Sequence, residues 1–419
     1  MNATITPRPL SGSIKIIASK SQAHRLLILA ALAEEKSLLI CEGMNEDIAA
    51  TMDCLNAMGA RVVKNGDEIS IFPIEKMGGK CKMCVRESGS TLRFLLPVIC
   101  ALGMNAQIEM CGRLPERPIS ELSDELQRHG VNIVKEGNIL HVSGKLESYD
   151  FKIAGNISSQ YISGLLFAMC ALKKPCSLAI TGEIQSRSYI EMTLRAMERF
   201  GISTARTESG FSLTGDERMS AYCGPVEGDW SNAAFWLCAG AMSEKGITLT
   251  GLDEHSAQGD RAVIEILRRF GADVSTNERG VRVRKKELTG TQIDAADIPD
   301  LIPVLSVLAC AAKGDTRIFN AQRLRIKESD RLAAIYELIG AAGADFTPTP
   351  DGLIIHGGAP LHGAKVSAHN DHRMAMSAAV LGTFAGKIEV EGAQCVKKSY
   401  PDFWDKFAML GGNVKRSGV

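Results

Sequence analysis

The hydrophobic positions along the chain follow a pattern that recurs six times. In each unit, apolar residues recur at helical spacing until a glycine, the residue that commonly follows the last turn of a helix. Short stretches of alternating polarity then flank turn pairs such as Asn65-Gly66 and Asp351-Gly352, which favour β-hairpins. The glycines, about 70 residues apart, are Gly59, Gly130, Gly201, Gly271, Gly343 and Gly411. A period of this length indicates a repeat of one α/β unit.

Each unit also contains a second predicted helix that is apolar on nearly every side. A helix without a polar face is buried all round. These helices are predicted at residues 25–33, 91–102, 162–172, 233–242, 301–312 and 374–386. We therefore expect two α/β domains of three units each, with the apolar helices inside and the strands and amphipathic helices outside.

The ends of the chain indicate how the domains are divided. The sixth unit reaches Gly412-Asn413-Val414 without a hairpin of its own. We expect the N-terminal segment around Ile5 and residues 13–17 to complete this unit. One domain is then discontinuous, with residues 1–18 and 227–419, and residues 19–226 form the other. The length of 419 residues also favours two domains.

Composition and charge exclude several classes of protein. Lys and Arg together number 48, as do Asp and Glu, so no overall field attracts nucleic acid or an anionic membrane. The chain lacks an apolar run of the roughly 18 residues that a membrane-spanning helix needs, and its start lacks the apolar region of a secretory signal. The twelve cysteines lie mostly in apolar runs, which is typical of reduced thiols in a cytoplasmic protein.

Polar residues directly precede each apolar helix. Ser, Asp and Asn at such positions are ordinary helix caps, but capping does not require Lys20, Gln160 or Arg373. The first turn of a helix offers free N–H groups and the positive end of its dipole. The sequence therefore predicts binding of phosphate or carboxylate groups at these helix starts.

A second concentration of charge lies in residues 323–331, which contain four basic side chains with Glu328 and Asp330 inserted. A solvated basic surface is the ordinary interpretation of such a run. Nucleic-acid binding is less favoured, because no aromatic residues interleave with the basic ones. The position before a helix favours a mixed catalytic segment. Arg117, between Pro115 and Pro118, is a further candidate anion ligand.

Six motifs, in order along nearly the whole chain, resemble the EPSP synthase family of enolpyruvyl transferases. They are ASKSQAHR at 18–25, SGSTLR at 88–93, ERPI at 116–119, SSQ at 158–160, RIKESDR at 325–331 and NDHRMAM at 370–376. The resemblance implies two inside-out α/β domains of three repeats each. It also implies transfer of the enolpyruvyl group of phosphoenolpyruvate to the 5-hydroxyl of shikimate 3-phosphate, with release of phosphate.

The resemblance further implies roles for individual residues. Asp300 corresponds to the proton acceptor, Glu328 to the proton donor, and Lys20 meets both substrates. The residues implied to bind shikimate 3-phosphate are Lys20, Ser21, Arg25, Ser158, Ser159, Gln160, Ser186, Asp300 and Lys327. Those implied to bind phosphoenolpyruvate are Lys20, Gly89, Arg117, Gln160, Arg331, Arg373 and Lys398. Glu87 and Arg323 stand where the family commonly has Asn, so no contact is carried over to them.

These residue types suit the implied chemistry. The substrates carry two phosphates and two carboxylates, which Arg binds by bidentate pairs and Lys by a compact charge. The hydroxyl adds to C2 of phosphoenolpyruvate while C3 gains a proton, and the proton transfer is reversed as phosphate leaves. A base at the hydroxyl and an acid at C3 are needed, and fixed carboxylates also stabilise a cationic transition state. We expect no metal and no cofactor. We also expect a monomer that binds neither nucleic acid nor membranes.

Two alternatives remain at this point. The first is the sister enolpyruvyl transferase that acts on UDP-N-acetylglucosamine and carries a catalytic cysteine ahead of an Arg-Pro pair. Cys111 precedes Arg117-Pro118 at a different spacing, and Ser21 stands where the sister family has Asn, so Cys111 is interpreted as an incidental thiol. The second is a non-catalytic RNA-binding repeat protein, which would not need Asp300 and Glu328 beside so many cations.

Overall fold

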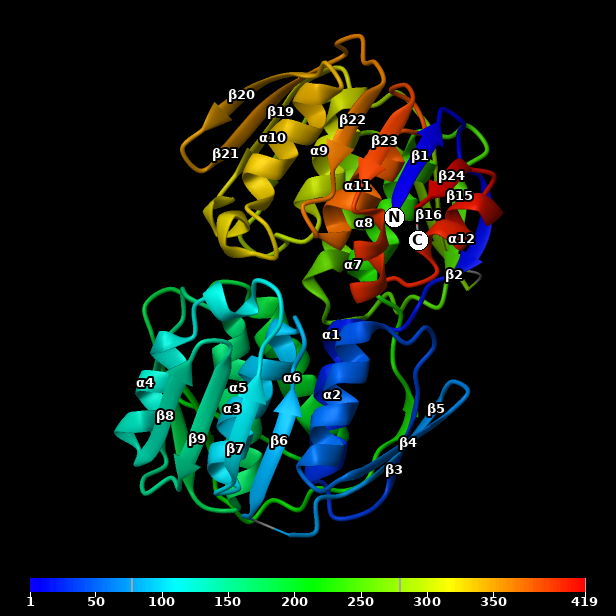
Figure 1. Ribbon diagram of the computed structural model, residues 1–419. Helices are drawn as coiled ribbons and strands as arrows, with labels where there is room; N and C mark the ends of the chain where they lie inside the picture. The colour runs from blue at the N-terminus through cyan, green and yellow to red at the C-terminus, as the bar shows by residue number, and fades with distance from the viewer. Residues whose placement is uncertain (77, 279, 419) are drawn as a thin grey trace. The chain divides into compact units, whose positions relative to one another are not determined.

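The computed structural model describes residues 1–76, 78–278 and 280–418 (Figure 1). The chain divides into two compact units. Unit 1 comprises Met1–Ile17 and Glu227–Val419, and unit 2 comprises Ala18–Val226. The expected division differs at one residue: Ala18 lies in unit 2, where its N–H donates to the Glu42 carbonyl at 2.8 Å.

Unit 2 contains three four-stranded sheets in its described residues. The first has the order β14 (Cys223–Pro225), β3 (Ser37–Ile40), β5 (Glu68–Phe72) and β4 (Arg61–Asn65). The second has the order β6 (Lys80–Cys84), β7 (Asn105–Glu109), β9 (Ile139–Gly144) and β8 (Val131–Glu136). The third has the order β10 (Asp150–Ala154), β11 (Cys176–Thr181), β13 (Gly210–Leu213) and β12 (Ala205–Arg206). In each sheet the first two strands are parallel and the remaining neighbours are antiparallel.

Unit 1 repeats this arrangement in its described residues. Its first sheet has the order β2 (Gly12–Lys15), β15 (Ile247–Thr250), β17 (Gly280–Arg284) and β16 (Asp273–Asn277). The second has the order β18 (Gln292–Asp294), β19 (Gly314–Phe319), β21 (Gly352–Gly357) and β20 (Asp345–Thr349). The third has the order β22 (Ala364–Ser367), β23 (Ile388–Glu391), β1 (Asn2–Thr6) and β24 (Asn413–Ser417). The predicted six-fold repeat is therefore confirmed.

The N-terminal segment serves two different sheets. As expected, β1 completes the sixth repeat, because it pairs with both β23 and β24. The expectation that residues 13–17 also complete this repeat is wrong. β2 precedes helix α1 (Lys20–Leu32) of unit 2 but pairs in parallel with β15 of unit 1. Conversely, β14 precedes helix α7 (Trp230–Ala241) of unit 1 but pairs with β3 of unit 2. The chain changes unit after each of these strands, so the first and fourth repeats exchange their outer strands.

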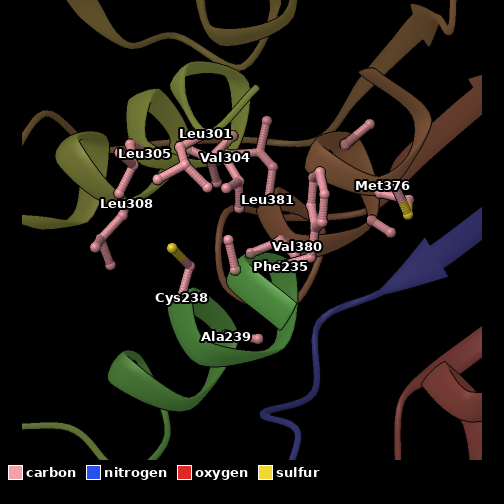
Figure 2. Packing of buried hydrophobic residues seen from close by; sticks show 14 of the residues in the cluster. Phe235, Cys238, Ala239, Leu301, Val304, Leu305, Leu308, Met376, Val380 and Leu381 are labelled. Carbon is pink, nitrogen blue, oxygen red and sulfur yellow. The ribbon is translucent and has the colours of Figure 1, made fainter. Parts of the chain in front are cut away.

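Within the part of the chain that the structure describes, the interior of each unit consists of three helices that pack on one another. They are α1 (Lys20–Leu32), α3 (Gly89–Ala101) and α5 (Ser159–Leu172) in unit 2, and α7 (Trp230–Ala241), α9 (Ile302–Ala311) and α11 (His372–Leu381) in unit 1. Figure 2 shows Phe235 of α7, Leu305 of α9 and Val380 of α11 in the shared core of unit 1. The helices predicted to be apolar all round are thus the buried ones, and the sheets lie outside them.

Six further α-helices show why the terminating glycines recur. They are α2 (Glu46–Ala57), α4 (Ser120–Arg128), α6 (Arg187–Arg199), α8 (Val263–Arg269), α10 (Arg331–Ala341) and α12 (Phe403–Met409). The six predicted glycines follow them, with φ between +81° and +99°. A side chain disfavours this left-handed backbone, which explains the choice of glycine. Among the helices of the described residues, none combines the length and apolarity needed to span a bilayer.

Candidate functional site

The polar residues before the buried helices are of two kinds. Some cap the helix, and others carry side chains that capping does not require. Ser19, Ser88 and Ser158 cap α1, α3 and α5 by accepting hydrogen bonds from backbone N–H groups of the first turn. Asp229 and Asp371 do the same for α7 and α11. The caps leave Lys20, Gln160 and Arg373 in the first helical turn, as the sequence predicts.

Arg25 is the most enclosed of the predicted anion ligands of unit 2. Its side chain is buried on α1, where it donates to Ser21 O at 2.6 Å, Thr193 Oγ1 at 2.8 Å and Tyr189 O at 2.8 Å. These partners are neutral oxygens, and no salt bridge involves Arg25 within the described residues. Burial lowers the pKa of its guanidinium to about 10. A buried cation with neutral partners is suited to an anionic ligand.

Lys20 has a different environment at the start of the same helix. Its Nζ lies 2.9 Å from Asp47 Oδ2, and both side chains are largely buried. Asp47 lies in the first turn of α2, where a carboxylate is also favoured by the helix dipole. Lys20 is therefore held in position by a carboxylate that the sequence analysis did not single out.

Gly89, Arg117 and Gln160 are linked through Arg93. Arg93 donates to Gln160 Oε1 at 3.2 Å and to the Pro118 carbonyl at 2.9 Å. A Cβ added at Gly89 would collide with Arg93 Nη1 and would lie 2.8 Å from Arg117 Nη1. The three predicted residues are therefore brought together around the N-terminus of α3. Arg93 was missed as a site residue, although it lies one helical turn after Gly89 in the SGSTLR motif.

The predicted serines lie at the starts of two neighbouring helices. Ser158 and Ser159 begin α5, and Ser186 directly precedes α6, which packs against both α5 and α1. Ser159 and Ser186 are buried. Ser186 also has a left-handed backbone with φ of +54°, which is strained for a residue with a side chain. Strain of this kind is typical of functional positions.

In unit 1, three carboxylates surround Arg331. This side chain, only 1% exposed, donates to Asp300 Oδ1 at 2.6 Å, Glu328 Oε2 at 2.6 Å and Asp371 Oδ2 at 2.7 Å. Arg373 donates to the second oxygen of Asp300 at 2.8 Å. We call these five residues the Arg331 cluster. It contains the four predicted residues and Asp371, which both caps α11 and pairs with Arg331. The sequence indicated only the capping role of Asp371.

The charges of the cluster shift the ionisation of Asp300 and of the neighbouring Lys327. Burial opposes ionisation of Asp300, but Arg373, Lys327 and Arg331 outweigh it and hold the pKa of this carboxyl far below its usual range. Burial lowers the pKa of Lys327 to about 8, although Asp300 acts in the opposite direction. At neutral pH Asp300 is therefore ionised, and Lys327 titrates close to the physiological range.

Two further residues lie at the border of the cluster. Lys398, at the end of the 3₁₀ helix Ala393–Lys398, donates to the Asn370 carbonyl at 2.9 Å, just before α11. Asp260 is buried and accepts a hydrogen bond from Ser231. Burial and the nearby Asp300 raise the pKa of Asp260 to about 7. Asp260 lies in an amphipathic segment that carried no functional signal in the sequence.

The structure also describes the two positions that depart from the family pattern, Glu87 and Arg323. The carboxyl group of Glu87 packs against Gly112, where an added Cβ would meet Glu87 Cδ at 2.5 Å. Arg323 lies in the 3₁₀ helix Gln322–Ile326. Among the described residues, no three His, Cys, Asp or Glu side chains are grouped as metal ligands.

Comparison with known proteins agrees with this arrangement of residues. Residues 5–407 match a family profile described as EPSP synthase (3-phosphoshikimate 1-carboxyvinyltransferase). The chain is 39% identical over 425 residues to the 3-phosphoshikimate 1-carboxyvinyltransferase of Clostridium kluyveri, with 99% of each chain covered. It is 41% identical to the protein of the same name from Clostridium perfringens, with 98% of each covered.

Solved structures share the fold at lower sequence identity. The EPSP synthase from Acinetobacter baumannii superposes with a TM-score of 0.83 at 22% identity, covering 100% of both chains. The enolpyruvyl transferase NikO from Streptomyces tendae superposes with a TM-score of 0.78 at 16% identity, covering 100% of this chain and 99% of that one. These two likenesses show that the chain shares the fold of both proteins.

Proposed function

The chain belongs to the EPSP synthase family and is an enolpyruvyl transferase of the shikimate pathway, and we propose how its residues divide that reaction. The enzyme transfers the enolpyruvyl group of phosphoenolpyruvate to shikimate 3-phosphate and releases phosphate. The observation that carries the proposed division is the Arg331 cluster, in which Asp300 and Glu328 share one buried guanidinium. Two carboxylates held so close together suit a reaction that needs both a base and an acid.

Shikimate 3-phosphate binds, in this proposal, at the helix starts of unit 2. Arg25 and Lys20 supply positive charge, and Ser158, Ser159 and Ser186 donate neutral hydrogen bonds to the phosphate. The neutral partners of Arg25 and the burial of Ser159 and Ser186 support these roles. The remaining contacts are assigned to Ser21, Gln160, Asp300 and Lys327.

The binding of phosphoenolpyruvate is assigned to two groups of residues, which are described separately. In unit 2 it meets Arg117 beside Gly89, with Lys20 and Gln160 as further ligands. The Nε of Arg117 is buried with no hydrogen-bond partner among the described residues, which supports a role in binding an anion. In unit 1 the ligands are Arg331, Arg373 and Lys398.

The proton transfers are assigned to the carboxylates of the Arg331 cluster. Asp300 accepts the proton of the 5-hydroxyl as its oxygen bonds to C2 of phosphoenolpyruvate. Glu328 donates a proton to C3, which yields a tetrahedral intermediate. In the second step C3 returns its proton to Glu328 and the C2–C3 double bond re-forms. The C2–O bond to phosphate breaks, and the leaving phosphate takes up the proton that Asp300 holds.

The ion pairs of the cluster imply that substrate binding precedes the action of Asp300 as a base. Asp300 bonded to Arg331 and Arg373 is a weak base, because both cations stabilise its ionised form. We infer that the anionic groups of phosphoenolpyruvate draw these arginines away from Asp300. The pKa of the carboxyl then rises, and the base becomes effective only when the substrate is bound.

The cellular setting is proposed on more general grounds. We propose a cytoplasmic monomer that uses no cofactor and binds neither nucleic acid nor membranes. The balance of 48 basic and 48 acidic residues supports the last point. The cysteines are free thiols and most are buried, which supports a reducing compartment.

An acceptor assay tests the proposed function. Phosphate release is measured with phosphoenolpyruvate and either shikimate 3-phosphate or UDP-N-acetylglucosamine. We expect release only with shikimate 3-phosphate. Release only with the sugar nucleotide would assign the chain to the sister activity.

A further inference from the structure

Cys84 and Cys111 form a pair of neighbouring thiols in unit 2. Their Sγ atoms lie 3.6 Å apart. Cys84 is the last residue of β6, and Cys111 lies two residues beyond the end of the parallel neighbour β7. Both side chains are partly accessible, whereas most of the other cysteines are buried. Small thiol reagents therefore reach this pair in the folded protein.

Backbone hydrogen bonds hold the two cysteines in register. The N–H of Val85 donates to the Glu109 carbonyl at 2.9 Å, and the N–H of Cys111 donates to the Arg86 carbonyl at 2.8 Å. A disulfide needs a sulfur separation of about 2.05 Å, so the sulfurs must approach by about 1.5 Å. Gly112, with φ of +54°, follows Cys111 directly and gives the chain freedom to adjust.

The pair lies at the base of two segments that meet again at the site. From Cys84 the chain runs through Glu87 to Gly89 at the start of α3. From Cys111 it runs through Gly112 to Arg117. The segments touch midway, where the Glu87 carboxyl packs on Gly112, and at their ends, where Arg117 adjoins Gly89. A bond between the sulfurs thus connects both segments at their base.

We propose that Cys84 and Cys111 are a site of reversible oxidation that controls binding of phosphoenolpyruvate at Gly89 and Arg117, an inference that rests on the proposed function of those residues. The oxidant is a low-molecular-weight disulfide such as glutathione disulfide. One cysteine thiolate displaces a glutathione thiolate and forms a mixed disulfide. The second cysteine loses its proton and displaces the other glutathione, so two cysteine thiols are oxidised and one disulfide is reduced to two thiols.

The environment of Cys111 slows its reaction with oxidants. Burial and the neighbouring Cys84 raise the pKa of the Cys111 thiol to about 11. The thiolate is the reactive species, so Cys111 is largely unreactive at neutral pH. Oxidation is therefore a slow response to a sustained change in the thiol pool.

The test uses a Cys223→Ser background, because Cys223 is an exposed cysteine outside the pair. This variant is incubated with glutathione disulfide, and its peptides are mapped by mass spectrometry without reduction. We expect a Cys84–Cys111 cross-link. We also expect the KM for phosphoenolpyruvate to rise at least about tenfold, since displacing a binding group by about 1 Å costs up to about a hundredfold. Dithiothreitol should restore the original value.

Two matched variants and one second substrate complete the test. Cys84→Ser and Cys111→Ser in the same background should keep their KM for phosphoenolpyruvate after the same treatment. The KM for shikimate 3-phosphate should stay unchanged, because Arg25 and the serines lie on other segments. Glutathione adducts without the cross-link, or a cross-link without a change in KM, would overturn the proposal. Failure of the reduced enzyme to release phosphate would instead contradict the proposed function. The peptide map would still show whether Cys84 and Cys111 form a disulfide.

Discussion

Replacement of Arg331 by Met should destabilise unit 1 strongly. The guanidinium lies in the interior and pairs with Asp300, Glu328 and Asp371, of which Asp371 is fully buried. Breaking a buried pair by removing one partner costs about 3–5 kcal/mol, because a buried charge is left without compensation. For a unit of roughly 200 residues, each kcal/mol lowers the melting temperature by about 2–4 °C. We expect a fall of about 6–20 °C for the transition of unit 1.

The pH dependence separates this cause from a simple loss of packing. In the wild type, burial opposes ionisation of Asp371, but Arg331 holds its pKa below the usual range. The pair therefore stabilises the fold above the unfolded pKa of about 3.9 and loses this effect as the pH falls. Without Arg331 the buried carboxyl takes up a proton more readily than in the unfolded chain. The deficit of Arg331→Met should therefore shrink between pH 7 and pH 5.

Differential scanning calorimetry of three variants provides the assay. Arg331→Met/Asp371→Asn should recover part of the lost stability, because the amide removes the uncompensated charge. Arg416→Met, which breaks an exposed pair, should change stability by less than about 1 kcal/mol. A melting temperature of Arg331→Met within 2 °C of the wild type would refute the reasoning, as would a deficit that is independent of pH.

Three further predictions concern ligand binding. Gly89→Ala should raise the inhibition constant of glyphosate, an inhibitor that the family resemblance implies for this site, by at least about tenfold, with a smaller rise in the KM for phosphoenolpyruvate. The reason is that the new methyl group meets Arg93 and Arg117, and overpacking costs about 1–3 kcal/mol. Equal losses for both ligands in inhibition kinetics would indicate a general distortion of the helix start. Lys327→Met should weaken binding of shikimate 3-phosphate in titration calorimetry, and unchanged affinity would remove Lys327 from the site. Burial lowers the pKa of Lys327 to about 8, so the affinity of the wild type for shikimate 3-phosphate should fall above pH 8 as the ammonium loses its proton. This decrease in affinity above pH 8 should be absent in Lys327→Met.

The sequence predicted the repeat well because its signals are local. Glycine at the helix end and apolar residues around a helix act within one element, so they can be read without knowledge of the fold. The exchange of β2 and β14 between the units could not be read in this way. Strands that pair over long sequence distances are selected by the partners that surround them, and short stretches such as Gly12–Lys15 suit several sheets.

The candidate site was predicted as a set of residues but not as a network. The family resemblance implied roles for Asp300, Glu328, Arg331 and Arg373, and the structure links these four by ion pairs. Asp371 was missed because capping alone explains an Asp at a helix start. Arg93 was missed because its partners, Gln160 and Pro118, are distant in sequence. The ion pairs of Arg331 and the hydrogen bonds of Arg93 depend on how the repeats pack together, which local sequence patterns do not encode.

The turnover of two amide variants tests the central assignment most directly. Asp300→Asn and Glu328→Gln keep the size of each side chain but remove its ability to transfer a proton. With both substrates saturating, phosphate release by each variant should be about 10²- to 10⁴-fold slower than in the wild type. Turnover of both variants within tenfold of the wild type would contradict the assignment of the Arg331 cluster as the acid–base centre.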